Sequence, residues 1–477
     1  MQLVNSQQAR QLDQLSEQLG VATKQLMENA GKAVAQILMR QTKPTDGYVV
    51  FFIGKGNNGG DGLVAQKHLR EKGYTTLLIK EGDDLKPHTA TLRKASWIVD
   101  GLLGTGLKGE VRGWTKEAID CINNSGKKVL SIDIPSGLSA DKGYPLGVAV
   151  KATLTVSLGN VKLGVVLYPG CDTAGQIECA DIGIPKKAYE KLNLPYHLLE
   201  PSYFKSHFKP RPKDVSKKDF GHVLVVGGSK EMPGAGFLAS LGALRSGAGL
   251  VTYALPQEAF EKFDPNFAEV MVKPIADEKD VLKACEKKEV VLIGPGLGRK
   301  KETQKLVQTL LDKIKLPIVL DADGLNAIAL NPGILKERKA PTVLTPHVGE
   351  MANLFGWQPA EIEKARVQGA LDGAAIWKCH LILKGFRTLI ALPNGELYVN
   401  PTGNPGMASA GMGDLLAGII AGFLAQGFPA DIASLAGVYI HGLAGDMARE
   451  ELGEKGLIAS DVSRYVPQAI KLVEKVN

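Results

Sequence analysis

Short apolar runs alternate with helix-like segments through most of the chain. In its first part, strand-like runs stand at 48–53, 76–79, 97–100, 129–133 and 154–157. Helical spacing covers 6–19 and 23–39, where Ser6 and Thr23 are candidate N-cap residues. Because short buried strands that alternate with helices are typical of parallel sheets, we expect this part to belong to the α/β class.

A second series of the same kind begins after residue 220. Its expected strands lie at 222–226, 290–293, 317–320, 342–344 and 381–383. Between the two series, the segment 195–218 holds four prolines among charged and aromatic residues, a composition typical of a linker. We therefore expect two α/β domains, at 1–208 and 209–477.

Composition and charge narrow the class of partner. The 477 residues carry a net charge of +7, and the lysines are scattered, which argues against nucleic acid or a membrane surface as a partner. The longest apolar run, 415–425, is too short to cross a bilayer, and the N-terminal residues are polar. Five cysteines without CxxC spacing fit a reduced, cytoplasmic setting. We expect small-molecule ligands and a homo-oligomer.

The most informative segment is glycine-rich, at 404–414, and stands directly before an apolar helical run. Free N–H groups at a helix start bind phosphate oxygens, and glycine lets the backbone come close to an anion. Asp414 could accept a proton from a hydroxyl that attacks phosphorus. The segment therefore favours phosphoryl transfer to an alcohol. The alternative is a closely packed buried helix in which Asp414 is a plain cap.

Polar or glycine-rich clusters also follow the strands of the second series. They lie at 294–298, 321–323, 345–347 and 384–385. In open α/β sheets ligands bind beyond the carboxyl ends of the strands, so this repeated pattern predicts a site at that edge.

Polar clusters follow strands of the first series too. The loop 54–62 matches a dinucleotide-binding fingerprint only loosely, and a plain tight turn explains it about as well. Asn58, Asp100 and Ser136 could together supply oxygens to a hard cation. Asp133 follows an apolar run, so burial could suit it to acid–base chemistry. Alternatively, Asp133 only ties down the loop that follows it.

The clusters at 55–61, 103–106 and 131–137 resemble the NAD(P)H-hydrate epimerase family, and the resemblance extends over roughly residues 1–200. It implies a Rossmann-like α/β/α sandwich with a potassium ion held by Asn58, Asp100 and Ser136. It also implies that Asp133, the candidate acid–base residue, contacts the damaged nucleotide. The residues implied to contact the damaged nucleotide are Asn57, Asn58, Gly59, Gly60, Asp61, Gly104, Thr105, Gly106, Leu107, Lys108, Gly109 and Glu110.

In the second half, six segments occur in one order that resembles the NAD(P)H-hydrate dehydratase family, a branch of the ribokinase-like α/β fold. They are 220–229, 243–249, 294–298, 321–326, 344–351 and 411–414. The resemblance implies that Asp414 is catalytic and that ADP binds with Mg²⁺. The implied nucleotide contacts are Lys384, Gly385, Phe386, Arg387, Thr388, Asn404, Pro405, Gly406, Met407, Ala408, Ser409, Ala410, Gly411, Met412 and Gly413. The implied hydrate contacts are Gly296, His347, Val348, Gly349, Glu350, Met351, Ala352, Asn353 and Asp414.

Together, the two halves resemble enzymes that repair nicotinamide nucleotides. The resemblance implies that the first half interconverts the R and S hydrates of NAD(P)H. The second half would dehydrate the S form at the expense of ADP, giving AMP and phosphate, because phosphorylation turns a hydroxyl into a good leaving group. The alternative is a ribokinase-like kinase of a vitamin precursor, fused to a nucleotide-binding module without catalytic activity.

Overall fold

The computed structural model describes residues 1–88, 92–261 and 268–475. It divides into two compact units, Gln2–Tyr196 and His197–Asn477, and Met1 is grouped with the second. The boundary that we expect at 208/209 therefore falls inside the second unit. Leu199 and Phe204 explain the difference, because both are fully buried in the core of the second unit. The proline-rich segment thus starts as part of that core.

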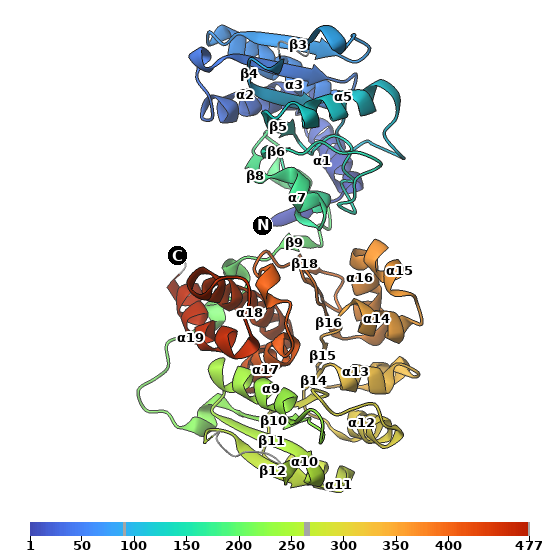
Figure 1. The fold of residues 1–477 in the computed structure, drawn as a ribbon, viewed down its shortest axis with the longest axis vertical. Helices are drawn as coiled ribbons and strands as arrows, with labels where there is room; N and C mark the ends of the chain where they lie inside the picture. Colours follow the sequence, from blue (N-terminus) through green and yellow to red (C-terminus); the bar gives the residue numbers. More distant parts are fainter. Residues whose placement is uncertain (89–91, 262–267, 476–477) are drawn as a thin grey trace. The chain divides into compact units, whose positions relative to one another are not determined.

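The first unit is a parallel sheet with helices on both faces (Figure 1). Its elements are β1 (Gln2–Val4), α1 (Ser6–Gln18), α2 (Thr23–Met39), β2 (Tyr48–Ile53), α3 (Asn57–Glu71), β3 (Thr76–Lys80), β4 (Ala95–Gly101), α5 (Gly113–Asn124), β5 (Lys128–Ile132), β6 (Leu154–Leu158), β7 (Val161–Lys162), α6 (Leu163–Val166), α7 (Gly170–Ala174), β8 (Gln176–Ala180) and α8 (Lys186–Glu190). The strand order β3-β2-β4-β5-β6-β8 is parallel throughout, which confirms the predicted parallel sheet.

Strand β2 shows why this sheet is covered on both faces. Val49, Phe51 and Ile53 pack with α2 and α3 in one apolar cluster. Val50 and Phe52 pack with α5 in another. Because successive side chains point to opposite faces of a strand, a continuous apolar run needs helices on both sides.

The first two helices begin where the spacing predicts, but their expected caps are wrong by one residue. Ser6 and Thr23 are the first helical residues of α1 and α2. The N-cap of α1 is Asn5, whose side-chain oxygen accepts from the Gln8 N–H at 2.8 Å. In return, the Asn5 N–H donates to the Gln8 side-chain oxygen at 3.0 Å. Ala22 precedes α2 and gives no side-chain cap.

The second unit has a larger, mostly parallel sheet. Its elements are β10 (His222–Val226), α9 (Pro233–Arg245), β11 (Leu250–Pro256), α10 (Gln257–Phe260), β12 (Met271–Ile275), α11 (Glu278–Ala284), β13 (Val290–Ile293), α12 (Lys301–Lys313), β14 (Ile318–Leu320), α13 (Asp323–Ile328), β15 (Thr342–Leu344), α14 (Val348–Phe355), α15 (Pro359–Lys364), α16 (Arg366–Trp377), β16 (His380–Leu383), β17 (Leu389–Ala391), β18 (Leu397–Val399), α17 (Met412–Ala425), α18 (Ala430–Leu452) and α19 (Ala459–Lys475). Strands β12-β11-β10-β13-β14-β15-β16 are parallel, and β17 and β18 continue antiparallel. Helices α9, α17 and α18 lie on one face and α12, α13 and α14 on the other (Figure 1).

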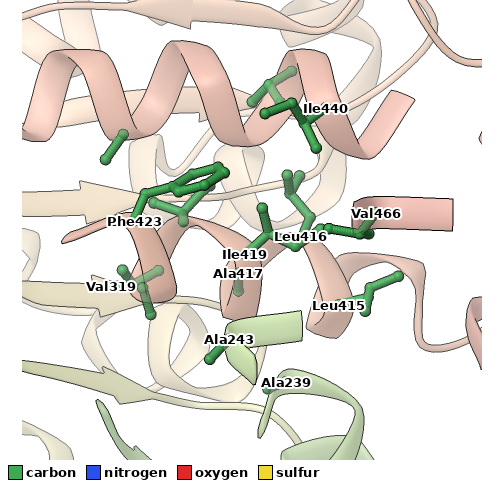
Figure 2. Packing of buried hydrophobic residues seen from close by; sticks show 14 of the residues in the cluster. Ala239, Ala243, Val319, Leu415, Leu416, Ala417, Ile419, Phe423, Ile440 and Val466 are labelled. Carbon is green, nitrogen blue, oxygen red and sulfur yellow. The ribbon is translucent and has the colours of Figure 1, made fainter. Parts of the chain in front are cut away.

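Helix α17 is apolar on all sides and packs among the sheet, α9 and α18 (Figure 2). It meets α9 through glycines. A Cβ built on Gly418 would lie 1.9 Å from the carbonyl oxygen of Ala239, and one built on Gly242 would lie 2.4 Å from that of Leu415. The two helices therefore touch backbone to backbone, which fixes the first turn of α17.

The apolar run at 415–425 is thus a core helix. In the part of the chain that the structure describes, no helix combines the length and apolar character needed to cross a membrane.

Candidate active sites

A cavity of about 600 Å³ lies in the first unit, beyond the carboxyl ends of its strands. The segments after β2 and β4 line it, at 55–58 and 102–108, and so does Asp133 after β5. Helices α1 and α3 contribute Asp13 and Asp61. This is the place where open α/β sheets bind ligands, and the volume suits a small organic molecule.

Most nucleotide contacts that the sequence predicts line this cavity. They are Asn57, Asn58, Asp61, Gly104, Thr105, Gly106, Leu107 and Lys108. Gly59, Gly60, Gly109 and Glu110 are not among the lining residues. Gly59 has a packing role instead, since a Cβ there would lie 1.9 Å from the carbonyl oxygen of Gly54. Only glycine lets α3 start this close to the loop before it.

Asp133 has a left-handed backbone conformation (φ 68°), which is uncommon outside glycine but accessible to aspartate. Three bonds to β6 hold it. Its N–H donates to the Val156 carbonyl oxygen at 2.7 Å, and its own carbonyl oxygen accepts from the Ser157 hydroxyl at 2.9 Å. The N–H of Leu158 donates to Oδ1 at 3.0 Å. The strained residue is therefore fixed with its carboxylate at the cavity wall.

Lys162, on β7, forms an ion pair with Asp133 Oδ1. Its Nζ also donates to the Leu158 carbonyl oxygen at 2.9 Å. The side chains of Lys162 and Asp133 are 4% and 13% exposed, and both line the cavity. No role was expected for Lys162 from the sequence, because the stretch 157–162 matches the epimerase family only loosely.

Asp61 and Asp13 bring two more carboxyl groups to the same wall. Burial, followed by repulsion from Asp133 and Asp13, raises the pKa of Asp61 to about 8. Burial also raises the pKa of Asp13, although attraction to Lys162 opposes the shift. At neutral pH Asp61 is therefore mostly protonated and can donate a hydrogen bond to a ligand. Asp13 was not predicted, since α1 carries no local motif.

Two of the three residues expected to hold a cation contact one carbonyl oxygen, and Ser136 joins the third, Asp100, to them. The Asn58 amide nitrogen donates to the Leu103 carbonyl oxygen at 3.0 Å, and the Ser136 hydroxyl lies 3.1 Å from the same atom. Ser136 also donates to Asp100 Oδ1 at 2.5 Å.

Asp100 is completely buried, and no cationic side chain pairs with it among the described residues. Burial raises the pKa of Asp100, while hydrogen bonds from Ser136 and Ser131 oppose the shift. Because a buried carboxylate without a counter-charge is costly, a cation fits this set of oxygens.

In the second unit, the first turn of α17 lies beside a partly buried lysine. Lys384, directly after β16, donates to Asp321 Oδ1 at 2.8 Å, and the Thr345 hydroxyl donates to the same oxygen at 2.7 Å. A Cβ built on Gly413 would lie 3.1 Å from Lys384 Nζ. Glycine therefore leaves room here for an anion, which would find helix N–H groups on one side and an ammonium on the other.

Asp414 stands in the first turn of α17, as the sequence predicts. Burial raises its pKa to about 7; repulsion from Asp321 adds to the shift, and attraction to Lys384 opposes it. A carboxyl group with this pKa is partly ionised at neutral pH, which suits a general base.

His347 is the N-cap of α14, which begins with Val348. Its Nδ1 accepts from the N–H groups of Gly349 and Glu350 at 2.9 and 3.2 Å. Glu350 accepts from the His347 N–H at 2.8 Å, and its carboxylate lies 3.8 Å from Lys384 Nζ. The imidazole is 58% exposed, with Nε2 3.3 Å from Glu350. His347 Nδ1 therefore caps the start of α14, and Nε2 lies beside the Glu350 carboxylate.

The other expected hydrate contacts differ in exposure. Met351 and Ala352 are core side chains, at most 1% exposed. Asn353 donates to Asn326 at 3.4 Å near the surface. Gly296 has a φ of 67°, and a Cβ there would lie 2.6 Å from a neighbouring carbonyl oxygen, so this position needs glycine.

Both segments expected to bind the nucleotide reach the same region. The first, 384–388, connects β16 to β17, and the second, 404–413, leads into α17. The N–H of Asn400, just before the second segment, donates to the Thr388 carbonyl oxygen at 2.9 Å. Asn404 is buried and donates to a carboxylate of α18 at 2.9 Å. The two segments meet where Gly413 lies beside Lys384.

Two family models match the chain. One, described as NAD(P)H-hydrate dehydratase, covers residues 223–468. The other, described as YjeF-related protein N-terminus, covers 23–87 and 76–164. The dehydratase model therefore matches the second unit of the structure, and the YjeF-related model matches the first unit.

Curated relatives match over nearly the full length. The bifunctional NAD(P)H-hydrate repair enzyme of Moorella thermoacetica is 37% identical over 100% of this chain and 98% of its own. That of Coxiella burnetii is 37% identical over 96% of this chain and 97% of its own.

Solved structures resemble the second unit. The ADP/ATP-dependent NAD(P)H-hydrate dehydratase of Bacillus subtilis, co-crystallised with ATP and Mg²⁺, is 30% identical and covers 58% of this chain and 99% of its own, with a TM-score of 0.52. A ribokinase-like superfamily protein of Enterococcus faecalis is 29% identical and covers 60% and 99%, also with a TM-score of 0.52. These likenesses confirm the ribokinase-like α/β fold. Because relatives above 30% identity span its whole length, the chain belongs to the family of bifunctional NAD(P)H-hydrate repair enzymes.

Proposed function

We propose that the first unit interconverts the R and S hydrates of NADH and NADPH. The second unit dehydrates the S form with ADP as the phosphate donor, releasing AMP and phosphate. The observation that carries this proposal is Asp414, a carboxyl group with a pKa of about 7 in a glycine-rich helix start beside Lys384. Full-length relatives named as bifunctional repair enzymes support it.

Dehydration begins with Asp414. The carboxylate takes the proton from the hydroxyl of the hydrate as the hydroxyl oxygen attacks the terminal phosphorus of ADP. The N–H groups at 410–414 and the ammonium of Lys384 hold the phosphoryl oxygens while charge moves onto the departing AMP. Phosphate then leaves the ring carbon, a proton leaves the neighbouring carbon, and the double bond is restored.

Magnesium would be bound at this site together with the nucleotide. In the described residues, no group of three histidine, cysteine, aspartate or glutamate side chains could hold a metal ion. That composition fits an ion carried mainly on phosphates and completed by one or two carboxylates. Asp321 and Glu350, beside Lys384, are the carboxylates that would complete it.

In the first unit, Asp133 acts at the hydroxyl-bearing carbon of the reduced ring. Asn58, Asp100 and Ser136 would hold the potassium ion, whose charge would balance the buried Asp100. The N–H of Leu103 donates to Ser136 Oγ at 2.8 Å, and its carbonyl oxygen accepts from Asn58. Since the cavity-lining loop begins beside Leu103, the ion would also order that loop.

The test uses the full-length protein with hydrated NADH and ADP. We expect NADH absorbance to return, AMP and phosphate to appear, and both epimers to be consumed. Asp414→Asn keeps the shape but cannot accept the proton, so dehydration should fall by ~10²–10⁴-fold while the epimers still interconvert. A vitamin-precursor kinase would accumulate a phosphoester and release no NADH, and that result would overturn the proposal.

A further inference from the structure

The first-unit cavity holds a buried cation in direct contact with Asp133. Lys162 is 4% exposed, lines the cavity and pairs with Asp133 Oδ1. Carboxyl groups approach it from three elements. Asp133 follows β5, Asp13 lies on α1, and Asp61 lies on α3. The thiol of Cys179 on β8 is the remaining titratable group coupled to it.

Lys162 and Asp133 each keep hydrogen-bonding capacity that no described residue takes up. An ammonium has three N–H donors. Asp133 Oδ1 and the Leu158 carbonyl oxygen take two of those of Lys162, and within the described residues nothing takes the third. Asp133 Oδ1 also accepts from the Leu158 N–H, whereas Oδ2 has no partner in the same residues. One donor and one acceptor are therefore available to a ligand in the cavity.

We propose that Lys162 is a second catalytic residue of the epimerase, the proton donor to the departing hydroxyl group. This inference rests on the proposed epimerase function of the first unit. An ionised Asp133 has no proton to give, and hydroxide is a poor leaving group, so the step needs an acid. The ammonium of Lys162 is the acid in contact with Asp133.

The reaction balances as follows. The hydroxyl-bearing carbon is bonded to the ring nitrogen. Lys162 gives a proton to the hydroxyl, the C–O bond breaks and water leaves, while the nitrogen lone pair forms a C=N bond. Water then attacks the opposite face, the C=N electrons return to nitrogen, and Asp133 Oδ2 takes the proton of the entering water.

The catalytic pair is restored by one further proton transfer. After inversion Lys162 is a neutral amine and Asp133 is a carboxylic acid. The water released in the first step accepts the proton from Asp133 Oδ2 and passes one to the Lys162 amine, which restores the ion pair with Oδ1. The leaving hydroxyl group and the entering water lie on opposite faces of the same ring carbon. Lys162 and Asp133, which lie side by side, can therefore reach both oxygens if they approach that carbon from the edge of the ring.

The experiment compares Lys162→Ala, Lys162→Arg and the parental full-length chain. Pure R hydrate is supplied without ADP, and its conversion to the S form is followed. We expect Lys162→Ala to lose ~10²–10⁴-fold in rate. Lys162→Arg keeps the positive charge but holds its proton too tightly, so it should be similarly slow. Retention of the parental rate by Lys162→Arg would show that only the ion pair matters.

Amine rescue separates a catalytic from a purely structural lysine. Small primary amines can enter a cavity of about 600 Å³, so ethylamine and related amines should restore part of the Lys162→Ala activity. The restored rate should vary with the pKa of the added amine, a response that lost packing cannot produce. Lys187→Ala, at an exposed position, should be as active as the parent and unresponsive to amines. Melting temperatures establish that each variant is folded.

Besides the parental rate in Lys162→Arg, two results with Lys162→Ala would overturn the inference, and a further result concerns the epimerase function on which it rests. If Lys162→Ala converts the R hydrate at the parental rate, or is slow and no amine restores it, Lys162 is not the proton donor. If the parental chain itself fails to interconvert the epimers, the proposed epimerase function is wrong.

Discussion

At the residue scale, burial prepares an aspartate for proton transfer. Desolvation penalises the charged form of a carboxyl group, and a nearby ammonium favours it. In Asp414 the effect of burial exceeds the attraction of Lys384, so the pKa rises to about 7. Lys384, which would hold the phosphoryl group, thus also limits the rise in the pKa of Asp414, so that this carboxyl group is still partly ionised at neutral pH.

Dehydration should therefore depend on pH through Asp414. The base reacts as the carboxylate, so kcat/KM for the S hydrate should be level above about pH 7 and should fall about tenfold per pH unit well below it. Initial rates from about pH 5 to pH 9, at saturating ADP, check this. A level profile down to pH 5 would mean that another group accepts the proton.

Asp133→Asn tests the catalytic role of Asp133 without disturbing its backbone. Asparagine also adopts the left-handed conformation that this position requires, so the fold should persist. Interconversion of the two hydrates should slow by ~10²–10⁴-fold, and dehydration of the S form should be unchanged. If rate and melting temperature fall together, Asp133 mainly stabilises its turn; a normal rate in a folded variant removes it from the mechanism.

What the sequence reveals of the sites depends on how local each contact is. Asp414 and Asp133 stand in short motifs at the start of a helix and at the end of a strand, so their positions were predictable. Asp13 reaches the same cavity from a helix without any motif, and Lys162 from a stretch that matches the family only loosely; the fold brings both there. Met351 lies inside a matching motif, yet its side chain belongs to the core.

At the element scale, α17 shows how an apolar helix and a reactive turn are combined. The residues after Asp414 are apolar on all sides, which predicts burial, and the closely packed buried helix was one of the two interpretations of this segment. Its closeness to α9 was not predictable, because a glycine records only the absence of a side chain and not the identity of its neighbour. The backbone contact of Gly418 with Ala239 supplies that neighbour. The position of Asp414 follows from it.

Gly418→Ala should therefore destabilise the second unit. The added methyl group would meet the Ala239 carbonyl oxygen at 1.9 Å, and overpacking of this kind costs ~1–3 kcal/mol. Gly234, on α9, is the matched control, because a Cβ there has open space; Gly234→Ala should be neutral or stabilise by up to ~1 kcal/mol. Urea unfolding gives both values. Equal stability of the two variants would contradict the packing argument.

At the scale of the whole molecule, two domains were predictable because two series of strands and helices are visible along the chain. The boundary was displaced from 208/209 to 196/197. Proline and charge suggest a linker, but the buried side chains of Leu199 and Phe204 decide where the second core starts. Scattered apolar residues in a polar segment are a weak signal, whereas their burial is a strong one.

Each unit should fold and act alone. Fragments 1–196 and 197–477 each retain a sheet with its own buried apolar clusters. We expect the first to interconvert the hydrates without ADP and the second to consume only the S form. Soluble expression and the two separate assays check this. Fragments that are insoluble apart and recovered only on co-expression would instead indicate a shared core.

Because the two compact units belong to one polypeptide, the ratio of the two active sites is fixed. Every molecule synthesised carries one copy of each unit, so the cell receives the two sites in equal number whatever the level of expression. Transcription and translation can raise or lower the total repair capacity, but they cannot rebalance its two steps. If one hydrate ever accumulates over the other, the imbalance must be corrected in the rate constants themselves, through residues such as Asp133 and Asp414.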